Sequence, residues 1–199
     1  MATLVGKKFP DLNVDAMNEM GDTFKLNILD EAVNNKKKVL LFWYPKDFTF
    51  VCPTELHAFQ ASLKEFEKRN TMVIGASCDT NEVHFAWLNT PKNNGGIEGV
   101  TYPLLADTTR NLSNILGILD IDSTEYSEET DSVIIEGSNV TFRATYLIDE
   151  TGKIFIAGIA LKMDKTDDTK GLDWLLSQKQ ISITNMVFQS REKKRGELI

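Results

Sequence analysis

Residues 38–56, KVLLFWYPKDFTFVCPTEL, contain the pattern that decides the fold. The nearly continuous apolar run at 38–44 is typical of a strand covered on both faces. After the cysteine the chain shows helical periodicity, with one apolar stripe made of Leu56, Phe59, Leu63 and Phe66. Pro53 and Glu55 are typical of the first turn of a helix. We therefore expect Cys52 at the N-terminus of a helix that directly follows a buried strand.

Outside this stretch, short apolar runs continue to alternate with helical patterns. We predict helices at 81–89 and 108–116, and further strands at 71–77, 142–148 and 153–159. The residues DETG at 149–152 are typical of a hairpin turn between the last two strands. Strands and helices that alternate along the chain and end in a hairpin predict an α/β fold, with a central mixed sheet and helices on both faces.

The composition of the 199-residue chain is that of a soluble globular protein, with 42% hydrophobic and 26% charged residues. Its net charge of −7 argues against nucleic acid as a partner, because phosphate binding needs clustered Lys and Arg. The basic run at 191–195 is interpreted as a solvated tail. No apolar segment has the length of a signal-peptide core or of a membrane span, which takes about 20 residues. We expect a cytoplasmic protein that does not bind membranes.

Cysteine and histidine are scarce, with two of each in the chain. Cys52 and Cys78 cannot build a secreted disulfide framework. His57 and His84 leave too few ligands for a convincing zinc site. The chain also has no Cys-x-x-Cys motif, so a dithiol oxidoreductase of the usual thioredoxin kind is not expected. We therefore expect no metal and no cofactor.

Cys52 is the candidate nucleophile. The thiolate is the reactive form of cysteine, and a free thiol with a pKa of about 8.5 is mostly protonated at neutral pH. A helix N-terminus carries about half a positive charge and free N–H donors, so we expect a lowered pKa for Cys52. Thr49 lies close enough in the sequence to place a hydroxyl against the sulfur. Without its surrounding motif, Cys52 would more readily be interpreted as a small buried apolar residue.

The segment FWYPKDFTFVCPTE, at 42–55, resembles the peroxiredoxins. It is similar to the 2-Cys branch that contains the alkyl hydroperoxide reductase peroxidase subunits and the thiol-specific antioxidant proteins. The similarity runs from about residue 4 to residue 159, and it includes VGKKFPDL, VHFAW, YPLLAD and FRATYLIDETG. The resemblance implies a thioredoxin-like fold and a thiol-dependent peroxidase that reduces hydrogen peroxide and organic hydroperoxides.

The resemblance also assigns roles to five residues. Cys52 matches the peroxidatic cysteine, which is oxidised to a sulfenic acid, and Thr49 matches the threonine whose hydroxyl bonds the sulfur and the peroxide. Pro45 matches the proline that shields the thiolate from solvent. Arg143 matches the active-site arginine, and Glu55 matches a residue that orients this arginine. Arginine stays charged and offers a rigid fork of N–H donors, which suits both the thiolate and the peroxide oxygens.

Partners follow from the same resemblance. It implies an external thiol reductant, either a thioredoxin-like protein or a flavoprotein reductase system, that returns the sulfenic acid to the thiol. It also implies a homo-oligomer, because relatives pair as dimers and often form rings of five dimers.

The C-terminal part of the chain departs from the family pattern. Relatives of this branch carry a second, resolving cysteine near the C-terminus, but residues 160–199 contain none. We therefore divide the chain into a thioredoxin-like peroxidase domain at 1–160 and an atypical segment at 161–199. Three explanations stay open: a natural single-cysteine peroxidase, a tail replaced through a frameshift or recombination, or Cys78 as the resolving partner. Cys78 follows a predicted buried strand, so a packing role is the preferred interpretation.

Two other functions stay open at this stage. The chain could be a holdase chaperone or a redox relay, or it could be a catalytically inactive scaffold. The intact set of Thr49, Cys52 and Arg143 favours the enzyme. His84 recurs in relatives, but we interpret it as a packed or capping residue rather than a catalytic one.

Overall fold

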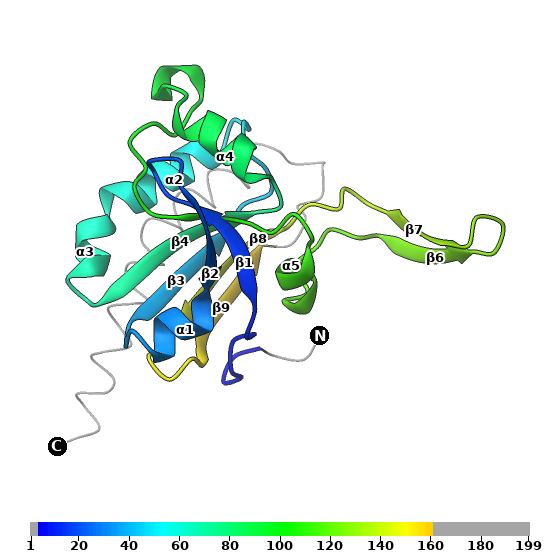
Figure 1. Cartoon of the computed structure of the whole chain (residues 1–199), viewed down its shortest axis with the longest axis horizontal. Coiled ribbons are helices and arrows are strands. Elements are labelled where there is room, and N and C mark those ends of the chain that lie inside the picture. Colours follow the sequence, from blue (N-terminus) through cyan, green and yellow to red (C-terminus); the bar gives the residue numbers. More distant parts are fainter. Residues whose placement is uncertain (1–3, 161–199) are drawn as a thin grey trace. The chain divides into compact units, whose positions relative to one another are not determined.

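The computed structural model describes residues 4–160 of the chain. At its centre is a seven-stranded sheet (Figure 1), whose strands in spatial order are β2 (Thr23–Asn27), β1 (Asn13–Met17), β5 (Leu104–Ala106), β4 (Thr71–Ser77), β3 (Lys38–Trp43), β8 (Arg143–Ile148) and β9 (Ile154–Ala160). β4 runs parallel to both β3 and β5, whereas the other neighbouring strands are antiparallel. The predicted α/β fold with a mixed sheet is confirmed. The prediction for residues 161–199 lies outside the described residues.

The helices of the described residues are α1 (Ile28–Val33), α2 (Cys52–Ala61), α3 (Leu63–Glu67), α4 (Asn81–Leu88) and α5 (Asn111–Ile115). A short 3-10 helix, Lys92–Asn94, lies in the loop after α4. β6 (Ser123–Ser127) and β7 (Ser132–Glu136) pair only with each other among residues 4–160, and they form a hairpin that extends away from the sheet (Figure 1). Across the part that the structure describes, no helix is long and apolar enough to cross a membrane.

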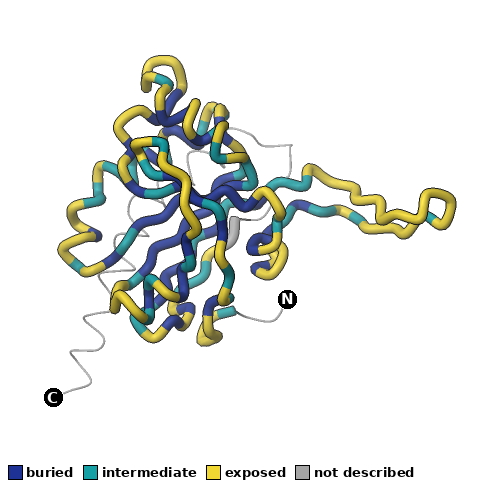
Figure 2. Tube along the Cα trace, viewed as in Figure 1, coloured by how far each residue is buried: buried dark blue, intermediate teal, exposed yellow. Residues whose placement is uncertain are grey.

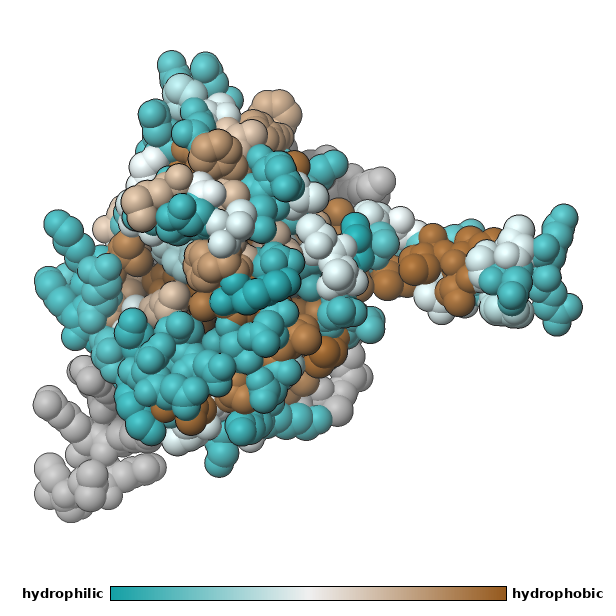
Figure 3. Space-filling model, viewed as in Figure 1, coloured by the Kyte–Doolittle hydropathy of each residue, from teal (hydrophilic) through white to brown (hydrophobic). Residues whose placement is uncertain are grey.

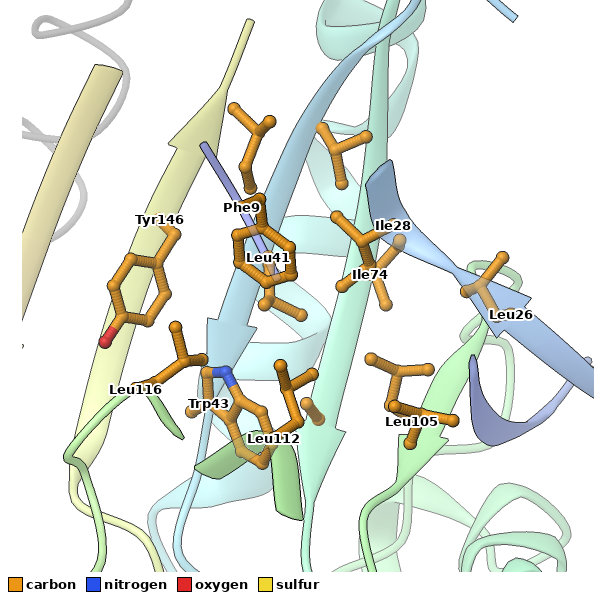
Figure 4. Packing of buried hydrophobic residues seen from close by; sticks show 14 of the residues in the cluster. Phe9, Leu26, Ile28, Leu41, Trp43, Ile74, Leu105, Leu112, Leu116 and Tyr146 are labelled. Carbon is orange, nitrogen blue, oxygen red and sulfur yellow. The ribbon is translucent and has the colours of Figure 1, made fainter. Parts of the chain in front are cut away.

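One face of the sheet carries the large apolar core. Leu41 and Trp43 of β3 belong to a buried cluster with Ile28 of α1 and Leu112 of α5 (Figure 4). Alternate residues of a strand point to opposite faces, so β3 presents Leu41 and Trp43 to this core and Phe42, which lies between them, to the other layer. A strand that is buried on both faces needs apolar residues at successive positions, which explains the continuous apolar run of β3.

The opposite face of the sheet is covered by α2 and α4. The ring of Phe42 stacks on Phe59 of α2, with 4.0 Å between the ring centroids. The ring of Tyr44 lies 5.7 Å from Trp87 of α4. Aromatic pairs at these separations add to the free energy of burial. The predicted arrangement, with helices on both faces, is therefore confirmed, and the aromatic layer fixes α2 against the end of β3.

The predicted apolar stripe at 56–66 is divided between two helices. α2 ends at Ala61, and α3 begins at Leu63 after Ser62, whose N–H donates to both Ala58 and Phe59. Six elements were not predicted from the sequence: α1, β1, β2, β5, β6 and β7. β5 is only three residues long, too short to show a period, and most positions of β2 are exposed, so it lacks the apolar alternation of a half-buried strand.

A buried ionisable pair fixes the loop between β3 and α2. His84 of α4 is fully buried, and its Nδ1 lies 2.7 Å from Oδ2 of Asp47 in this loop. The His84 Nε2 lies 3.1 Å from the main-chain oxygen of Leu105 in β5. A carbonyl oxygen can only accept, so Nε2 carries a hydrogen, and the contact between His84 and Asp47 needs one further proton. The interpretation of His84 as a packed residue agrees with this burial.

The pKa of both members of this pair lies above the ordinary value. Burial by itself lowers the pKa of His84, but its hydrogen bond and charge interaction with Asp47 raise it, with an upward net effect. Burial also raises the pKa of Asp47, and this outweighs the lowering effect of His84. Both shifts mean that the folded state holds the shared proton more tightly than the unfolded chain does. The resulting stability is present below the ordinary histidine pKa of about 6.5 and is lost as the pH rises through the folded value.

We predict that Asp47→Asn lowers the free energy of unfolding by about 3 kcal/mol at pH 6, because it leaves a buried histidine without its charged partner. The difference between wild type and variant should shrink as the pH is raised toward 9, because the wild-type pair loses its proton as the pH passes through its raised pKa. Urea unfolding at several pH values measures both effects. Asp15→Asn is the matched control, because Asp15 forms an exposed ion pair with Lys25; an equal loss in the control, or a difference that grows with pH, contradicts the assignment.

Candidate active site

Cys52 is the first residue of α2, directly beyond the loop that leaves β3. The side chain is buried, with no exposed surface. Among residues 4–160, no side chain caps this end of α2, and Pro53, the second residue of the helix, has no N–H to donate. The predicted position of Cys52, at a helix N-terminus after a buried strand, is confirmed.

Arg143 lies against the sulfur from the neighbouring strand. β8 begins at Arg143 and pairs antiparallel with β3, so its first residue reaches the end of the sheet where α2 starts. The Arg143 Nη2 donates to Cys52 Sγ over 3.3 Å. The contact joins residues that are far apart in the sequence, and sequence reasoning placed them together only through the family resemblance.

Glu55 binds the same guanidinium through a second donor. The Arg143 Nε donates to Glu55 Oε2 over 2.7 Å, and the Glu55 side chain is 9% exposed. Glu55 lies in the first turn of α2, so one helical turn supplies both the thiol and the carboxylate that hold the arginine. The fixed guanidinium places its remaining donors beside the sulfur.

Thr49 and Pro45 lie in the same β3–α2 loop, and both are half-buried. The Thr49 hydroxyl donates to the main-chain oxygen of Lys46 over 3.3 Å, and its side-chain hydrogen bond with Cys52 lowers the pKa of the thiol. Thr49 therefore lies near the sulfur, as predicted. The role of Pro45 as a shield of the thiolate stays a prediction.

Burial dominates the acidity of Cys52. It raises the pKa of the thiol, while the Thr49 side chain and the positive charge of Arg143 lower it, and the charge of Glu55 raises it again. The net effect raises the pKa of Cys52, so the expectation of a lowered pKa was wrong. The physical reason is that the thiol is completely removed from water, which penalises the charged form more than the nearby donors favour it. The Thr49 side chain and the Arg143 charge thus offset part of this penalty.

Two further contacts support the site and were not predicted. The Thr141 hydroxyl donates to the main-chain oxygen of Tyr44 over 3.1 Å, and Thr141 is buried. This bond ties the start of β8 to the loop that carries Thr49. The pair of Asp47 and His84 holds the same loop from the side of α4. No sequence signal identifies Thr141, because its partner is a main-chain oxygen.

Cys78 has a different environment. Both cysteines are free thiols, and Cys78 Sγ lies 3.8 Å from the hydroxyl of Ser113 in α5. Burial raises the pKa of the Cys78 thiol, and the hydrogen bond with Ser113 lowers it without reversing the direction. Cys78 shares no described hydrogen-bond partner with Cys52. These contacts agree with the preferred packing interpretation.

Comparison with known proteins supports the same assignment. The model of the AhpC/TSA family matches residues 5–156. The chain is 38% identical over 151 residues to a chloroplastic 2-Cys peroxiredoxin of Spinacia oleracea, covering 76% of this chain and 50% of the relative. It is 39% identical over 154 residues to an alkyl hydroperoxide reductase C of Helicobacter pylori, covering 76% of this chain and 68% of the relative. The chain thus spans about half the length of the chloroplastic relative.

A solved structure agrees with the sequence matches. The reduced 2-Cys peroxiredoxin of Plasmodium vivax superposes with a TM-score of 0.68 at 30% identity, covering 89% of this chain and 99% of that chain. The predicted thioredoxin-like peroxiredoxin fold is confirmed by this neighbour. The family model matches most of the chain, and the buried cysteine accepts a hydrogen bond from an arginine that a glutamate holds, so the chain belongs to the AhpC/TSA family.

Proposed function

We propose that this protein is a thiol-dependent peroxidase that reduces hydrogen peroxide and organic hydroperoxides through a sulfenic acid on Cys52. The observation that carries the proposal is the 3.3 Å contact from Arg143 Nη2 to Cys52 Sγ in a buried site. A cation held against a buried sulfur favours the thiolate, which is the nucleophilic form. The same cation lies where negative charge develops as an O–O bond breaks.

The chemistry of the first step follows from this arrangement. The Cys52 thiolate attacks one oxygen of the hydroperoxide, a new S–O bond forms and the O–O bond breaks. The second oxygen leaves with the electron pair and takes up a proton, which gives water or an alcohol. The sulfur is oxidised to the sulfenic acid and the peroxide is reduced. Arg143 binds the oxygens through its remaining donors, and Thr49 supplies a hydroxyl that can both donate and accept.

Recycling needs an external thiol. One thiol condenses with the Cys52 sulfenic acid to a mixed disulfide and releases water, and a second thiol then releases Cys52 and forms the reductant's disulfide. The chain contains no cysteine besides Cys52 and Cys78, and Cys78 contacts Ser113 rather than the site. We assign the reductant role to a thioredoxin-like protein or a flavoprotein reductase system, acting in the cytoplasm.

The surface beside the site suits an assembly of identical chains. Phe48 and Phe50 lie in the β3–α2 loop and are exposed, Phe50 completely. Large apolar side chains next to each other on a surface are typical of interaction sites. We therefore assign this loop to a homo-oligomer contact, as a dimer or a larger ring. A holdase function would draw on the same exposed residues, but it does not require the contact between Arg143 and Cys52.

We predict that Cys52→Ser abolishes reaction with hydrogen peroxide, while Cys78→Ser keeps it, because the Cys52 sulfur accepts a hydrogen bond from Arg143 whereas the Cys78 sulfur contacts the Ser113 hydroxyl. Intact mass after one equivalent of peroxide, with and without a sulfenic-acid trap, measures this. Wild type and Cys78→Ser should each gain one trapped adduct. A loss of two hydrogens without an adduct, removed by Cys78→Ser, would make Cys78 the resolving partner. No reaction of the wild type within minutes contradicts the proposed enzyme.

We predict that Arg143→Gln raises the pKa of Cys52 and lowers the second-order rate with peroxide at pH 7 by about a hundredfold. The guanidinium charge lowers the thiol pKa in the wild type, so its loss removes one of the interactions that oppose the effect of burial. Thiolate absorbance followed against pH gives the pKa, and stopped-flow kinetics give the rate. Arg69→Gln is the control, because Arg69 pairs with Glu65 on the surface. An unchanged or lowered pKa in Arg143→Gln would show that the arginine does not act through the thiolate.

A further inference from the structure

The β6–β7 hairpin is the part of the fold that the proposed chemistry does not use. All residues of β7 and the three central residues of β6 are exposed (Figure 2). Tyr126, Val133, Ile134 and Ile135 are each about half exposed or more. An isolated two-stranded hairpin is only marginally stable in water, and exposed β-branched and aromatic residues on it are typical of a surface that is covered in use.

The strand register separates the hairpin into two unlike faces. Thr124 pairs with Ile135 and Tyr126 pairs with Val133, and paired residues in an antiparallel ladder share a face. These four residues form what we call the apolar face. The opposite face is mostly polar and carries Ser123, Glu125, Ser127, Ser132, Ile134 and Glu136. The hairpin is therefore an amphipathic ribbon whose apolar side meets solvent in the single chain.

The charge of the hairpin has one sign. Residues 118–142 contain seven Asp and Glu and no Lys, Arg or His, so the rest of the chain carries 22 acidic and 22 basic residues. The carboxylates of Glu128, Glu129 and Asp131 belong to the turn between β6 and β7. Figure 3 shows this tip of the hairpin as hydrophilic. The Tyr126 hydroxyl donates to Asp131, which places one of these carboxylates directly at the end of the apolar face. The whole net charge of the protein thus belongs to this segment.

The base of the hairpin is closed by main-chain bonds. Asp120 N–H donates to Val140 over 2.8 Å, Asn139 N–H donates to Asp120 over 3.0 Å, and Phe142 N–H donates to Ile118 over 2.8 Å. Thr141, next to this base, is bonded to the active-site loop through Tyr44. The β6–β7 hairpin is therefore attached next to the start of β8. A protein segment bound to the hairpin would lie at the same end of the sheet as Cys52.

We propose that the β6–β7 hairpin docks an extended protein segment whose apolar side chains alternate with Lys or Arg. The apolar side chains cover Tyr126, Val133 and Ile135, and the cations meet the carboxylates of the tip, where opposite charges both steer and orient the partner. A second copy of this chain fits less well. It would bring like charges together, and four side chains on a ribbon fall far short of the ~800 Å² per partner that a stable dimer buries. The inference does not depend on peroxidase activity.

The test measures binding of two short fluorescein-labelled peptides by anisotropy on the full chain. One peptide alternates lysine with valine, and the other replaces each lysine with glutamate. We expect the lysine peptide to bind more tightly than the glutamate peptide, with an affinity that falls as salt is raised. Equal binding of the two peptides, or binding of neither, overturns the proposal.

Variants of the hairpin locate the contact. Val133→Ser with Ile135→Ser changes the apolar face and should weaken the lysine peptide at least about tenfold. Ile134→Ser, on the opposite face, is the matched control and should stay within about twofold of wild type. If Ile134→Ser loses as much affinity for the lysine peptide as the double variant does, the assignment of binding to the apolar face is overturned. If the double variant does not fold by circular dichroism, Glu128→Gln with Glu129→Gln decides, because this pair should lower both the affinity and its salt dependence.

Self-association is the competing outcome, and sedimentation velocity without peptide detects it. If Val133→Ser with Ile135→Ser lowers the oligomeric state of the wild type, then a second copy covers the apolar face and the proposed partner is wrong. An unchanged oligomeric state, together with the loss of peptide binding, supports the proposal that the β6–β7 hairpin docks a protein segment. Turnover of hydrogen peroxide with dithiothreitol should be the same in the double variant and in wild type, because no residue of the apolar face contacts Cys52.

Discussion

The site depends on one electrostatic constraint: a buried thiol that must ionise needs a fixed positive charge beside it. Removal from water raises the pKa of Cys52, and the Arg143 guanidinium opposes this from 3.3 Å. A half-buried guanidinium needs an anion of its own, which Glu55 supplies from the same helical turn as the thiol. Thiol, cation and carboxylate therefore form one unit that joins α2 to β8, and the geometry of the sheet has to bring these two elements together.

The loop between β3 and α2 is held from several sides, which explains how Thr49 and Cys52 can be placed accurately on an irregular segment. Thr141 bonds the loop at Tyr44, and the Asp47–His84 pair anchors it to α4 and, through Leu105, to β5. These bonds give the Thr141 hydroxyl and both ring nitrogens of His84 a partner, as buried polar groups require. Sites supported in this way keep their geometry better than sites on free loops.

Sequence patterns predicted those helices and strands whose burial imposes a regular spacing of apolar residues. The apolar run of β3, the strand β4 and the start of α2 at Cys52 were readable because both faces of the sheet are covered. β5 was too short and β2 too exposed to leave a pattern. Of the site, the position of Cys52 followed from local signals, while Arg143 came only from resemblance, because contacts between distant segments leave no local period. The raised pKa of Cys52 was missed because complete burial of one side chain is a property of the assembled fold.

The closed base of the β6–β7 hairpin has a consequence for how this chain can change. Main-chain hydrogen bonds at Asp120, Asn139 and Phe142 join the two ends of the hairpin segment before the chain enters β8. The seven-stranded sheet is therefore complete without the hairpin. When the ends of a loop are held together in this way, each doubling of the loop length adds only about 0.6 kcal/mol to the free-energy cost of closing it. The hairpin can therefore lengthen, shorten or accept a foreign sequence with little effect on the thiol. This makes residues 128–131 a suitable place to graft a tag or a new recognition sequence onto the protein.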